Sequence, residues 1–594
     1  MRSITHDTPN QIEADAEKPL FGSDVIAQAL RDLEIPFLAL NPGASFRGLH
    51  DSLVNHLGNQ SPQMLLVLHE ESAVAIAHGF AKATGRTMGA VLHSNVGLMH
   101  ASMAIFNAWC DRVPMMLLGA TGPVDAARRR PWIDWLHTSA DQGAIVRDYT
   151  KWDDQPASVP AAVEALARAR LIATTAPYGP TYVNLDAAIQ EAEVGGKPPL
   201  RNVSRALPPP AVHPSPELVR QAAQMLSQAS NPVMLVGRVG RDEKAWAARV
   251  ALAEALDMPV ICDLKTGATF PTAHPLLVSA PGFFLTPEAC EIVRSADVVV
   301  SLDWIDLGGT LRQCCGGEET AAKVLQISLD QHLHRGWNME YFGLAPTDAY
   351  LLCDPDVATP LLLEQVERRP ARDRAFEAMR EARAHGLDDH GPLTMKQLAE
   401  ALDVAIGETP VCFARLPLGW NGGYRNWSHP LDYLGYDGGA GIGSGPGMAV
   451  GTALGLIDTG RTTIAVLGDG DFLMGVTAIW TAVHYGIPLL IVVANNRSFY
   501  NDETHQEKVA IQRGRNVENK WIGQAISGPD IDIAAMARAQ GAIGIGPVSS
   551  GIELKTCLED ALDIVKGGGV VVVDARVQPG YSSNMSGTTA AHKR

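Results

Sequence analysis

The sequence predicts an α/β protein made of three doubly wound domains, each with a parallel sheet covered by helices on both faces. Two observations lead to this fold class. Short runs rich in Val, Ile and Leu recur along the chain, and stretches with helical spacing separate them. Strands that are apolar throughout, rather than at alternate positions, are typical of sheets buried on both faces. In addition, two stretches without this pattern divide the chain into three parts of domain size.

The two dividing stretches differ in composition. Residues 195–216 are rich in proline, whereas residues 368–392 are highly charged and are predicted to form a surface helix and a turn. Both are interpreted as linkers. The segments predicted around them are a flexible polar arm, a first domain, a middle domain and a third domain, at 1–18, 19–194, 217–367 and 393–594.

Each domain contains several predicted buried strands, with helices such as 71–85 between them. The first domain has strands at 36–40, 64–68, 89–93, 114–119 and 180–185. The middle domain has strands at 232–237, 258–263, 296–302 and 322–329, and the third at 410–414, 462–470, 488–496 and 569–577. In such sheets ligands bind beyond the carboxyl ends of the strands, so polar residues at those ends are the candidates for function.

Composition excludes several classes of function. The 594 residues carry a formal net charge of −17, whereas a protein that binds nucleic acid normally presents a basic face. The N-terminus lacks the apolar core of a signal peptide, and no uncharged apolar run reaches about 18 residues, so we expect no membrane span. The eight cysteines include no C-x-x-C pair and are interpreted as reduced thiols, which predicts a cytoplasmic protein.

A Gly-Asp-Gly turn and a pair of asparagines follow consecutive strands of the third domain. The turn is 468–470, with Asp469 at its centre, and the pair is Asn495 and Asn496. Glycines allow close backbone approach, and a helix predicted at about 474–485 would favour a phosphate at its N-terminus. Each feature alone is more often a structural turn or cap. Together, their carboxylate and amide oxygens predict a diphosphate bridged by Mg²⁺.

This combination resembles the cofactor motif of thiamine diphosphate-dependent enzymes. The three domains resemble the order found in the branch that contains acetolactate synthase, benzoylformate decarboxylase and 2-hydroxyacyl-CoA lyase: a pyrimidine-binding (PYR) domain, a middle domain and a diphosphate-binding (PP) domain. The resemblance implies thiamine diphosphate and Mg²⁺ as cofactors. It also implies that the side chains of Asp469 and Asn496 and the carbonyl of Ser498 ligate Mg²⁺, and that Gly468 lies against the cofactor.

The resemblance assigns further residues to the cofactor. Gly470 and Asp471 are expected to contact the diphosphate through their backbone amides. The glycine-rich stretch 439–451 resembles the segment that bends the cofactor into a V. By register, Ile442 would be the apolar wedge beneath the two rings, and the carbonyl of Ala440 would accept a hydrogen bond from the 4′-amino group.

A carboxylate of the first domain is expected at the other end of the cofactor. The stretch "LHEESAVAIAHGFAKATG" (68–85) resembles the family segment whose Glu faces N1′ of the aminopyrimidine, and that Glu matches Glu70. A protonated N1′ favours the imino tautomer, which can take the proton from C2 of the thiazolium ring. The alternative is that Glu70 is an acid at a helix N-terminus, stabilised by the helix dipole.

The residues around the reacting carbon are predicted from a narrower likeness. Residues 91–119 resemble benzoylformate decarboxylase, which implies that His93 moves protons; the alternative is a strand-end histidine bonded to a backbone carbonyl. Ala44 stands where that enzyme has a pocket Ser, with Ser45 beside it, and Gln142 is a candidate pocket residue. A second active-site His of that enzyme, in the middle domain, has no counterpart here, which puts benzoylformate itself in doubt.

An acyl-CoA substrate is an alternative for the same cofactor. Tyr500 stands where 2-hydroxyacyl-CoA lyases and oxalyl-CoA decarboxylases keep a Tyr near the cofactor, and Glu503 would reach the site. Arginines at 128–130, together with Arg513 and Arg515, would serve the phosphates of CoA. The competing interpretation is that these charges form a solvated surface.

These observations together predict a lyase that breaks, or in reverse forms, the bond beside the carbonyl of a 2-oxo acid or 2-hydroxy ketone. By resemblance, two subunits share each site, so a homodimer or homotetramer is expected. A non-catalytic regulatory relative is the alternative from another class, but such a protein would lose Glu70 or the Asp–Asn pair. His100, His137 and His484 lie near the motifs and are predicted to be structural.

Overall fold

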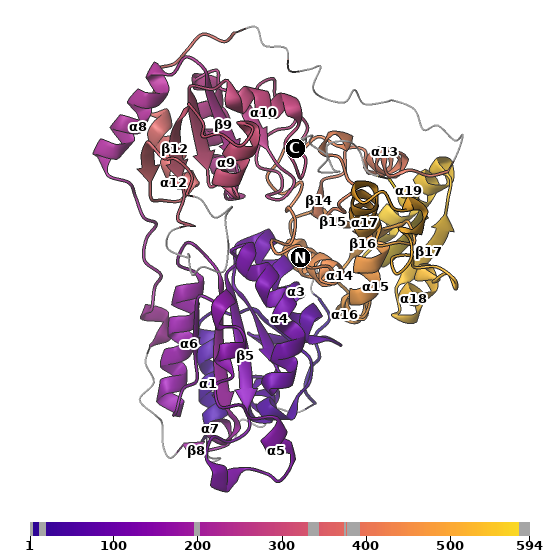
Figure 1. Ribbon diagram of the computed structural model, residues 1–594. Coiled ribbons are helices and arrows are strands. Elements are labelled where there is room, and N and C mark those ends of the chain that lie inside the picture. Colours follow the sequence, from indigo (N-terminus) through magenta and orange to yellow (C-terminus); the bar gives the residue numbers. More distant parts are fainter. Residues whose placement is uncertain are drawn as a thin grey trace.

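The computed structural model confirms three α/β domains, each built on a parallel sheet (Figure 1). The structure describes residues 4–10, 20–194, 202–330, 344–372, 376 and 392–580. The helix expected within 368–392 and most of the arm at 1–18 fall outside these residues. In the described part of the chain, no helix is both long enough and apolar enough to span a membrane.

The first domain has a six-stranded sheet in the order β3-β2-β4-β5-β7-β6, with all neighbours parallel. Its strands are β2 (Phe37–Leu40), β3 (Gln63–Leu66), β4 (Met88–Leu92), β5 (Met115–Thr121), β6 (Trp152–Asp154) and β7 (Pro180–Asp186). Its helices are α1 (Gly22–Asp32), α2 (Arg47–Asp51), α3 (Glu70–Thr84), α4 (Ser94–Cys110), α5 (Ile133–Leu136), α6 (Val159–Ala173) and α7 (Ala187–Gln190). A short antiparallel pair, β1 (Leu20–Phe21) with β8 (Glu193–Val194), joins the two ends of the domain.

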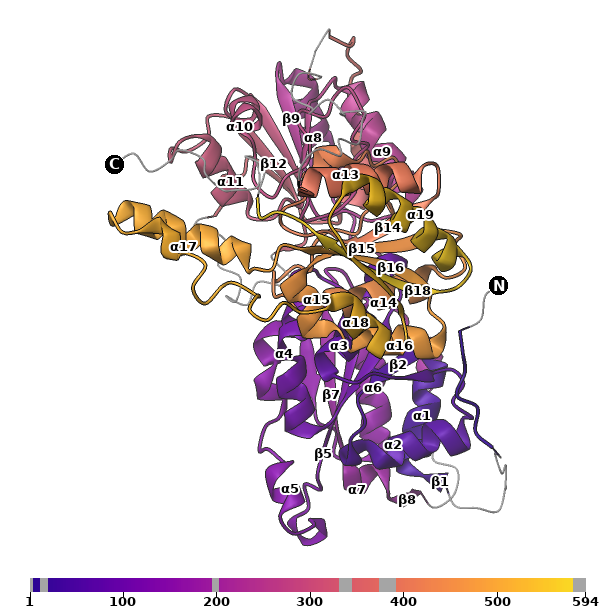
Figure 2. The same ribbon diagram turned by 90° about the vertical axis from the view of Figure 1, so that its right-hand side faces the viewer.

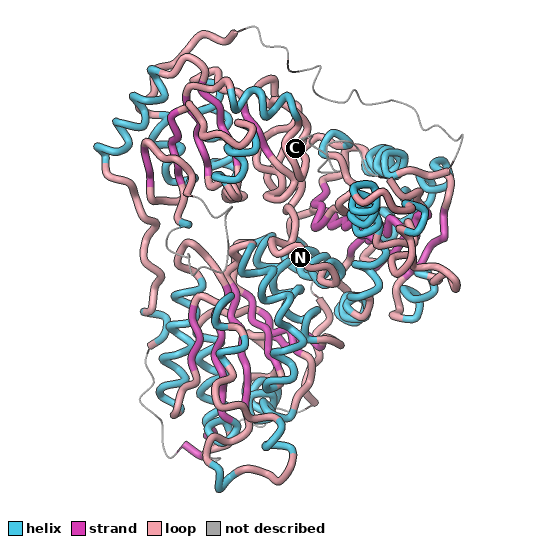
Figure 3. The backbone as a smooth tube through the Cα atoms, viewed as in Figure 1, coloured by secondary structure: helices cyan, strands magenta, loops and turns pink. Residues whose placement is uncertain are grey.

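The middle domain has a five-stranded parallel sheet in the order β10-β9-β11-β12-β13. Its strands are β9 (Pro232–Val236), β10 (Val260–Cys262), β11 (Val298–Leu302), β12 (Lys323–Ile327) and β13 (Ala349–Leu351). Its helices are α8 (Pro216–Gln228), α9 (Glu243–Ala255), α10 (Pro287–Arg294), α11 (Leu307–Cys314) and α12 (Pro355–Leu363). Helices lie on both faces of the sheet, as Figure 3 shows.

The third domain has a five-stranded parallel sheet in the order β14-β15-β16-β18-β17. Its strands are β14 (Val411–Arg415), β15 (Thr462–Gly468), β16 (Leu489–Asn495), β17 (Ile543–Val548) and β18 (Val570–Arg576). Its helices are α13 (Met395–Ile406), α14 (Gly445–Leu456), α15 (Asp469–Gly475), α16 (Ala478–Tyr485), α17 (Tyr500–Gln512), α18 (Ile533–Ala539) and α19 (Gly551–Lys566). Helix α17 projects away from the rest of this domain (Figure 2).

Helices α3 and α14 pack the first domain directly against the third. A Cβ added to Gly79 of α3 would lie 2.2 Å from the carbonyl oxygen of Met448, and one added to Gly451 of α14 would lie 1.9 Å from that of Ile76. Only glycine allows the two backbones to come this close. The two domains therefore share one apolar core, which fixes the start of α3, and with it Glu70, relative to the third domain.

Residues near the N-terminus also join these two domains. The amide of Thr5 donates to the carbonyl of Tyr485 at 2.9 Å, and the hydroxyl of Tyr485 donates to the carboxylate of Asp7 at 2.9 Å. The side-chain amide of Asn59, in the first domain, donates to the carbonyl of Asp7 at 3.0 Å. His484 stacks on Trp480 of α16, with ring centroids 4.7 Å apart. This part of the expected arm is therefore held between two domains.

Candidate functional site

The carboxylate of Asp469 lies at the carboxyl end of β15, where α15 begins. The helix starts at this residue, several residues earlier than the sequence pattern predicts, because Gly468 adopts the extended backbone of an N-cap. Asp469 is buried, and its carboxylate accepts hydrogen bonds from the amides of Gly470, at 2.9 Å, and Ser498, at 3.2 Å. Burial raises the pKa of Asp469 to about 6.

Asn496 lies beside Asp469, at the end of the neighbouring strand. Its side-chain oxygen accepts a hydrogen bond from the amide of Ser498 at 2.9 Å, so it converges with the carboxylate of Asp469 on one backbone group. Asn495 has a different role, because its amide donates to Asp574 within the sheet at 2.9 Å. A carboxylate, an amide oxygen and nearby main-chain oxygens form a donor set that fits Mg²⁺.

The two glycines that flank Asp469 have different surroundings. No atom lies within 4 Å of a Cβ added to Gly468. A Cβ added to Gly470 would lie 2.5 Å from the ring of Phe499, so a side chain there would displace this ring. Gly468 is half-buried and Gly470 is buried, so the room beside the buried acid lies at Gly468, which suits a phosphate group held close to a metal ion.

Asp471 uses its side chain to hold the glycine-rich turn in place. Its carboxylate accepts hydrogen bonds from the amides of Gly443, at 2.7 Å, and Gly445, at 3.1 Å. The guanidinium of Arg415, at the end of β14, pairs with the same carboxylate at 2.9 Å. The side chain of Asp471 therefore orders the turn, which leaves its backbone amide as the group for a ligand.

The turn that contains Ala440 and Ile442 rests on helix α4 of the first domain. Asn107 of α4 donates to the carbonyl of Gly441 at 3.2 Å. Ala440 has a φ of 58°, in the left-handed region that disfavours side chains, and its amide donates to Asp437 at 3.0 Å. Ile442 is half-buried beside it. The residues expected beneath the cofactor are thus held by both domains.

Tyr500 and Glu503 begin helix α17 close to the expected metal ligands. Glu503 is buried, and its carboxylate accepts a hydrogen bond from the hydroxyl of Ser498. Both residues line a cavity of about 550 Å³. Its remaining lining residues are Pro392, Leu393, Arg497, Lys520, Ser549, Arg576, Val577, Gln578 and Pro579.

Glu70 is the first residue of α3 and is buried, with 7% of its surface exposed. Nδ1 of His100, on α4, lies 3.2 Å from Oε2 of Glu70. His69 caps the helix by accepting the amide of Glu71 at 3.2 Å. Glu71 turns to the third domain, where its Oε1 would lie 3.3 Å from a Cβ added to Gly443. The two successive acids therefore face different neighbours.

His93 and Ser45 form a second pair in the first domain. The hydroxyl of Ser45 and Nδ1 of His93 are 2.8 Å apart, and His137 makes an edge-to-face contact with His93 at 4.8 Å between ring centroids. Burial lowers the pKa of His93, and the neighbouring His137 lowers it further. Its imidazole is therefore biased to the neutral form, which can accept a proton. Ala44 is exposed next to this pair.

The structure does not bring every predicted residue to these groups. Gln142 is fully buried inside the first domain, where its amide donates to the hydroxyl of Tyr182 at 2.8 Å. Two of the arginines proposed for CoA are engaged locally. Arg129 donates to backbone carbonyls at 2.7 and 2.8 Å, and Arg130 pairs with Asp134 at 2.9 Å.

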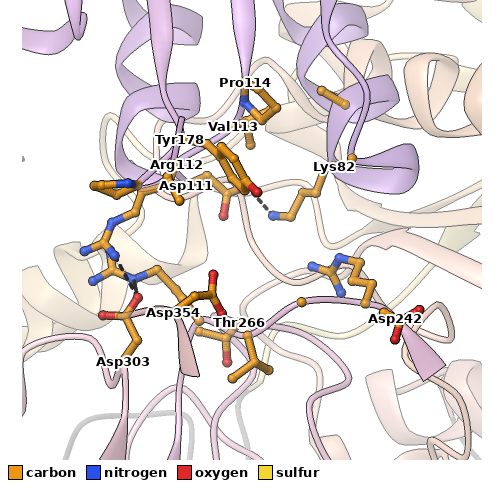
Figure 4. A pocket seen from close by; sticks show the side chains of 18 of the residues that line it. Lys82, Asp111, Arg112, Val113, Pro114, Tyr178, Asp242, Thr266, Asp303 and Asp354 are labelled. Atoms are coloured by element: carbon orange, nitrogen blue, oxygen red, sulfur yellow. Dashed lines mark hydrogen bonds and ion pairs between the residues drawn. The ribbon is translucent and has the colours of Figure 1, made fainter. Parts of the chain in front are cut away.

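A second cavity, of about 470 Å³, lies between the first and middle domains (Figure 4). Arg112 of the first domain pairs with Asp303, at the end of β11, at 2.7 Å, and Arg238 pairs with Asp330 at 3.0 Å. Burial alone would raise the pKa of Asp303, but Arg112 and Arg238 outweigh it and hold the pKa below its usual range. The charges named here are thus paired with one another.

Comparison with known protein families identifies matches along most of the chain. Three models of thiamine pyrophosphate enzymes match the chain: the N-terminal TPP binding domain at 21–145, the central domain at 219–332 and the C-terminal TPP binding domain at 418–575. Both groups of candidate residues fall within the two TPP binding domains.

Individual relatives are distant. Benzoylformate decarboxylase of Pseudomonas aeruginosa is 25% identical over 73% of this chain and 79% of its own length. Acetolactate synthase isozyme 3 large subunit of Escherichia coli is 25% identical over 94% of this chain and 95% of its own length. A solved benzoylformate decarboxylase from Polynucleobacter necessarius superposes with a TM-score of 0.77 at 22% identity, over 95% of this chain and 99% of that one, which shows the shared fold.

Proposed function

Because the chain belongs to the family of thiamine pyrophosphate enzymes, we propose that it is a thiamine diphosphate- and Mg²⁺-dependent lyase. It breaks, or in reverse forms by carboligation, the carbon–carbon bond next to the carbonyl of a 2-oxo acid or a 2-hydroxy ketone. The observation that carries the proposal is the buried carboxylate of Asp469. Among the described residues only backbone amides stabilise its charge, and the oxygen of Asn496 lies beside it.

The third domain holds the diphosphate end of the cofactor in this proposal. Asp469, Asn496 and the carbonyl of Ser498 ligate Mg²⁺, which needs hard oxygen donors. The amides of Gly470 and Asp471 would bind the diphosphate, and the amide of Gly470 would then share its proton with the carboxylate of Asp469. When bound, thiamine diphosphate supplies an electron sink for the bond that is cleaved. The chain itself contributes ligands, orientation and proton carriers.

Two groups of the first domain handle protons. Glu70 holds a proton at N1′ of the aminopyrimidine, where a buried carboxyl at the start of a helix is suitably rigid. His93 accepts or donates a proton at the reacting carbon, with the hydroxyl of Ser45 orienting its Nδ1. Its lowered pKa supports this role, because a neutral imidazole is the form that acts as a base near pH 7.

The protein is proposed to act as a cytoplasmic homodimer or homotetramer, in which two subunits share each site. The free state of all eight cysteines supports the location. Helix α17 and the segment after it support association, because Ile511, Trp521 and Ile522 are each more than half exposed there. An interface between copies would cover this apolar surface.

The test is a screen of 2-oxo acids, 2-hydroxy ketones and acyl-CoA thioesters with thiamine diphosphate and Mg²⁺ added. We expect turnover of a 2-oxo acid or a 2-hydroxy ketone and a loss of at least about 100-fold in Glu70→Gln, because a positioned proton carrier contributes that much or more. Glu34→Gln, which changes an exposed acid of the same domain, is the control and should match the wild type. Turnover that survives Glu70→Gln, or that needs an acyl-CoA, would overturn the proposal.

A further inference from the structure

We propose that His100 is a positioning residue for Glu70: it hydrogen-bonds to one carboxylate oxygen and so fixes the other as the oxygen that meets the pyrimidine ring. The inference rests on the proposed function, because it assigns a partner to the acid on which that function depends. The sequence alone predicts a structural role for His100, since an isolated histidine on a helix carries no sign of which side chain from another element it contacts.

The hydrogen bond joins two different helices. Glu70 opens α3, and His100 lies in the second turn of α4, with Nδ1 of the imidazole 3.2 Å from Oε2 of the carboxylate. A carboxylate can only accept, so Nδ1 carries the proton in this contact when Glu70 is ionised. Bonds between helices that are themselves held in a shared core keep their geometry.

A second histidine fixes the ring of His100. The ring of His69 stacks on it, with centroids 5.3 Å apart and planes within 10°. His69 is in turn fixed, because its Nδ1 accepts the amide of Glu71 as the cap of α3. One ligand atom each from His69, Glu70 and His100 lies within 4.8 Å of the others. The two stacked rings thus form a compact wall on the Oε2 side of Glu70.

The Oε1 side of Glu70 is bounded by Gly97 of α4, the helix that also carries His100. A Cβ added to Gly97 would lie 3.1 Å from Oε1 of Glu70 and 3.3 Å from its Cγ, so even alanine would crowd the carboxylate. Gly97 and His100 are three residues apart and share one face of α4. The helix therefore presents a donor to one oxygen and open space to the other, which leaves Oε1 for the ring.

The hydrogen bond also offsets part of the cost of burying Glu70. A buried carboxylate loses its contacts with water, and the Nδ1–H of His100 replaces one of them. The other titratable groups around it are His69, Glu71 and His93. Of the histidines that the structure describes, His100 is the one that hydrogen-bonds to Glu70.

The experiment compares two substitutions of His100 in the holoenzyme. His100→Leu removes the donor, and His100→Asn places an amide nitrogen near the position of Nδ1 but cannot titrate. We expect His100→Leu to lower kcat about tenfold or more, since a hydrogen bond to a charged group is lost, with little change in KM. Its acid limb in the pH profile should move to higher pH, and His100→Asn should restore most of kcat.

An activity-independent measurement accompanies the kinetics. In cofactor-free protein with ¹³C-labelled histidine, the ring resonance of His100 at one fixed pH should shift in Glu70→Gln, because the imidazole then faces an amide in place of a carboxylate. The resonance of His100 is identified by its absence in His100→Asn. His50→Asn, which changes an exposed histidine of the same domain, is the control and should alter neither the kinetics nor the resonance of His100.

The outcomes separate this inference from the proposed function. A pH profile and kcat of His100→Leu equal to the wild type, or a resonance of His100 that is the same in the wild type and in Glu70→Gln, overturns the role of His100. If Glu70→Gln is inactive in the same experiments, the proposed function survives that result. Should Glu70→Gln itself remain active, the proposed function fails first. His100→Leu is expected to fold normally, because its side chain is 61% exposed.

Discussion

Two aspartates occupy equivalent places in two domains and have opposite surroundings. Asp469 follows the last residue of β15 in the third domain, and Asp303 follows the last residue of β11 in the middle domain. Both side chains are buried. The pKa of Asp469 is raised to about 6 by burial, whereas the pKa of Asp303 is lowered because Arg112 and Arg238 outweigh the effect of burial.

The difference shows what a strand end does and does not determine. A parallel sheet brings acids to its carboxyl edge in either domain, which makes the edge a candidate for ligands. The cations that face the edge decide the outcome. Asp303 is neutralised by arginines and ties two domains together. Among the described residues, Asp469 receives hydrogen bonds only from backbone amides, which is the environment that the proposed metal site requires.

The largest expected effect on folding comes from Asp303→Asn. Loss of this carboxylate charge leaves the guanidinium groups of Arg112 and Arg238 without one of their buried partners. We therefore expect the free energy of unfolding to fall by about 3 kcal/mol. Chemical denaturation of the cofactor-free protein measures it. The affinity for Mg²⁺ should stay unchanged, because the ion pairs lie in another domain. Wild-type stability would show that these pairs do not hold the domains together.

The corresponding substitution in the third domain is Asp469→Asn. Removal of a carboxylate ligand should weaken Mg²⁺-dependent binding of thiamine diphosphate by about 100-fold, at the upper end of what even outer partners of a metal contribute. Calorimetric titration with both cofactors measures it. Asp502→Asn, an exposed acid on α17, is the matched control. If Asp469→Asn bound thiamine diphosphate and Mg²⁺ as tightly as the wild type, Asp469 would not be a metal ligand, and its contrast with Asp303 would have no functional meaning.

The sequence predicts one side of this contrast better than the other. Apolar runs predict the strands, and the polar residues at the ends of two neighbouring strands predict that Asp469 and Asn496 lie side by side. The pairing of Asp303 with Arg112 joins residues from two domains, and no local pattern reveals it. His100 is missed for the same reason, and Gln142, expected in a pocket, is buried inside its domain. Spacing along a chain fixes the element that carries a residue, but contacts between elements depend on tertiary packing.

A third acid at a strand end gives the smallest and most discriminating effect. Asp354 follows β13 and lines the cavity of Figure 4, and burial followed by repulsion from Asp356 raises its pKa to about 6. Unlike Asp469 it has a structural task, because its carboxylate caps α12 by accepting the amide of Asp356 at 2.8 Å. Asparagine is an equally good cap without a charge.

Asp354→Asn is therefore expected to stabilise the protein, and more at high pH. With a folded-state pKa of about 6 and an ordinary value when unfolded, the folded wild type binds more protons between about pH 4 and 6, so its stability falls as pH rises through that window. The gain from Asp354→Asn should be about 1 kcal/mol larger at pH 8 than at pH 5. Denaturation at both pH values measures it. A gain that does not depend on pH would mean that the carboxyl of Asp354 is not destabilised by burial, and that a raised pKa at a strand end does not by itself distinguish Asp469 from an ordinary cap.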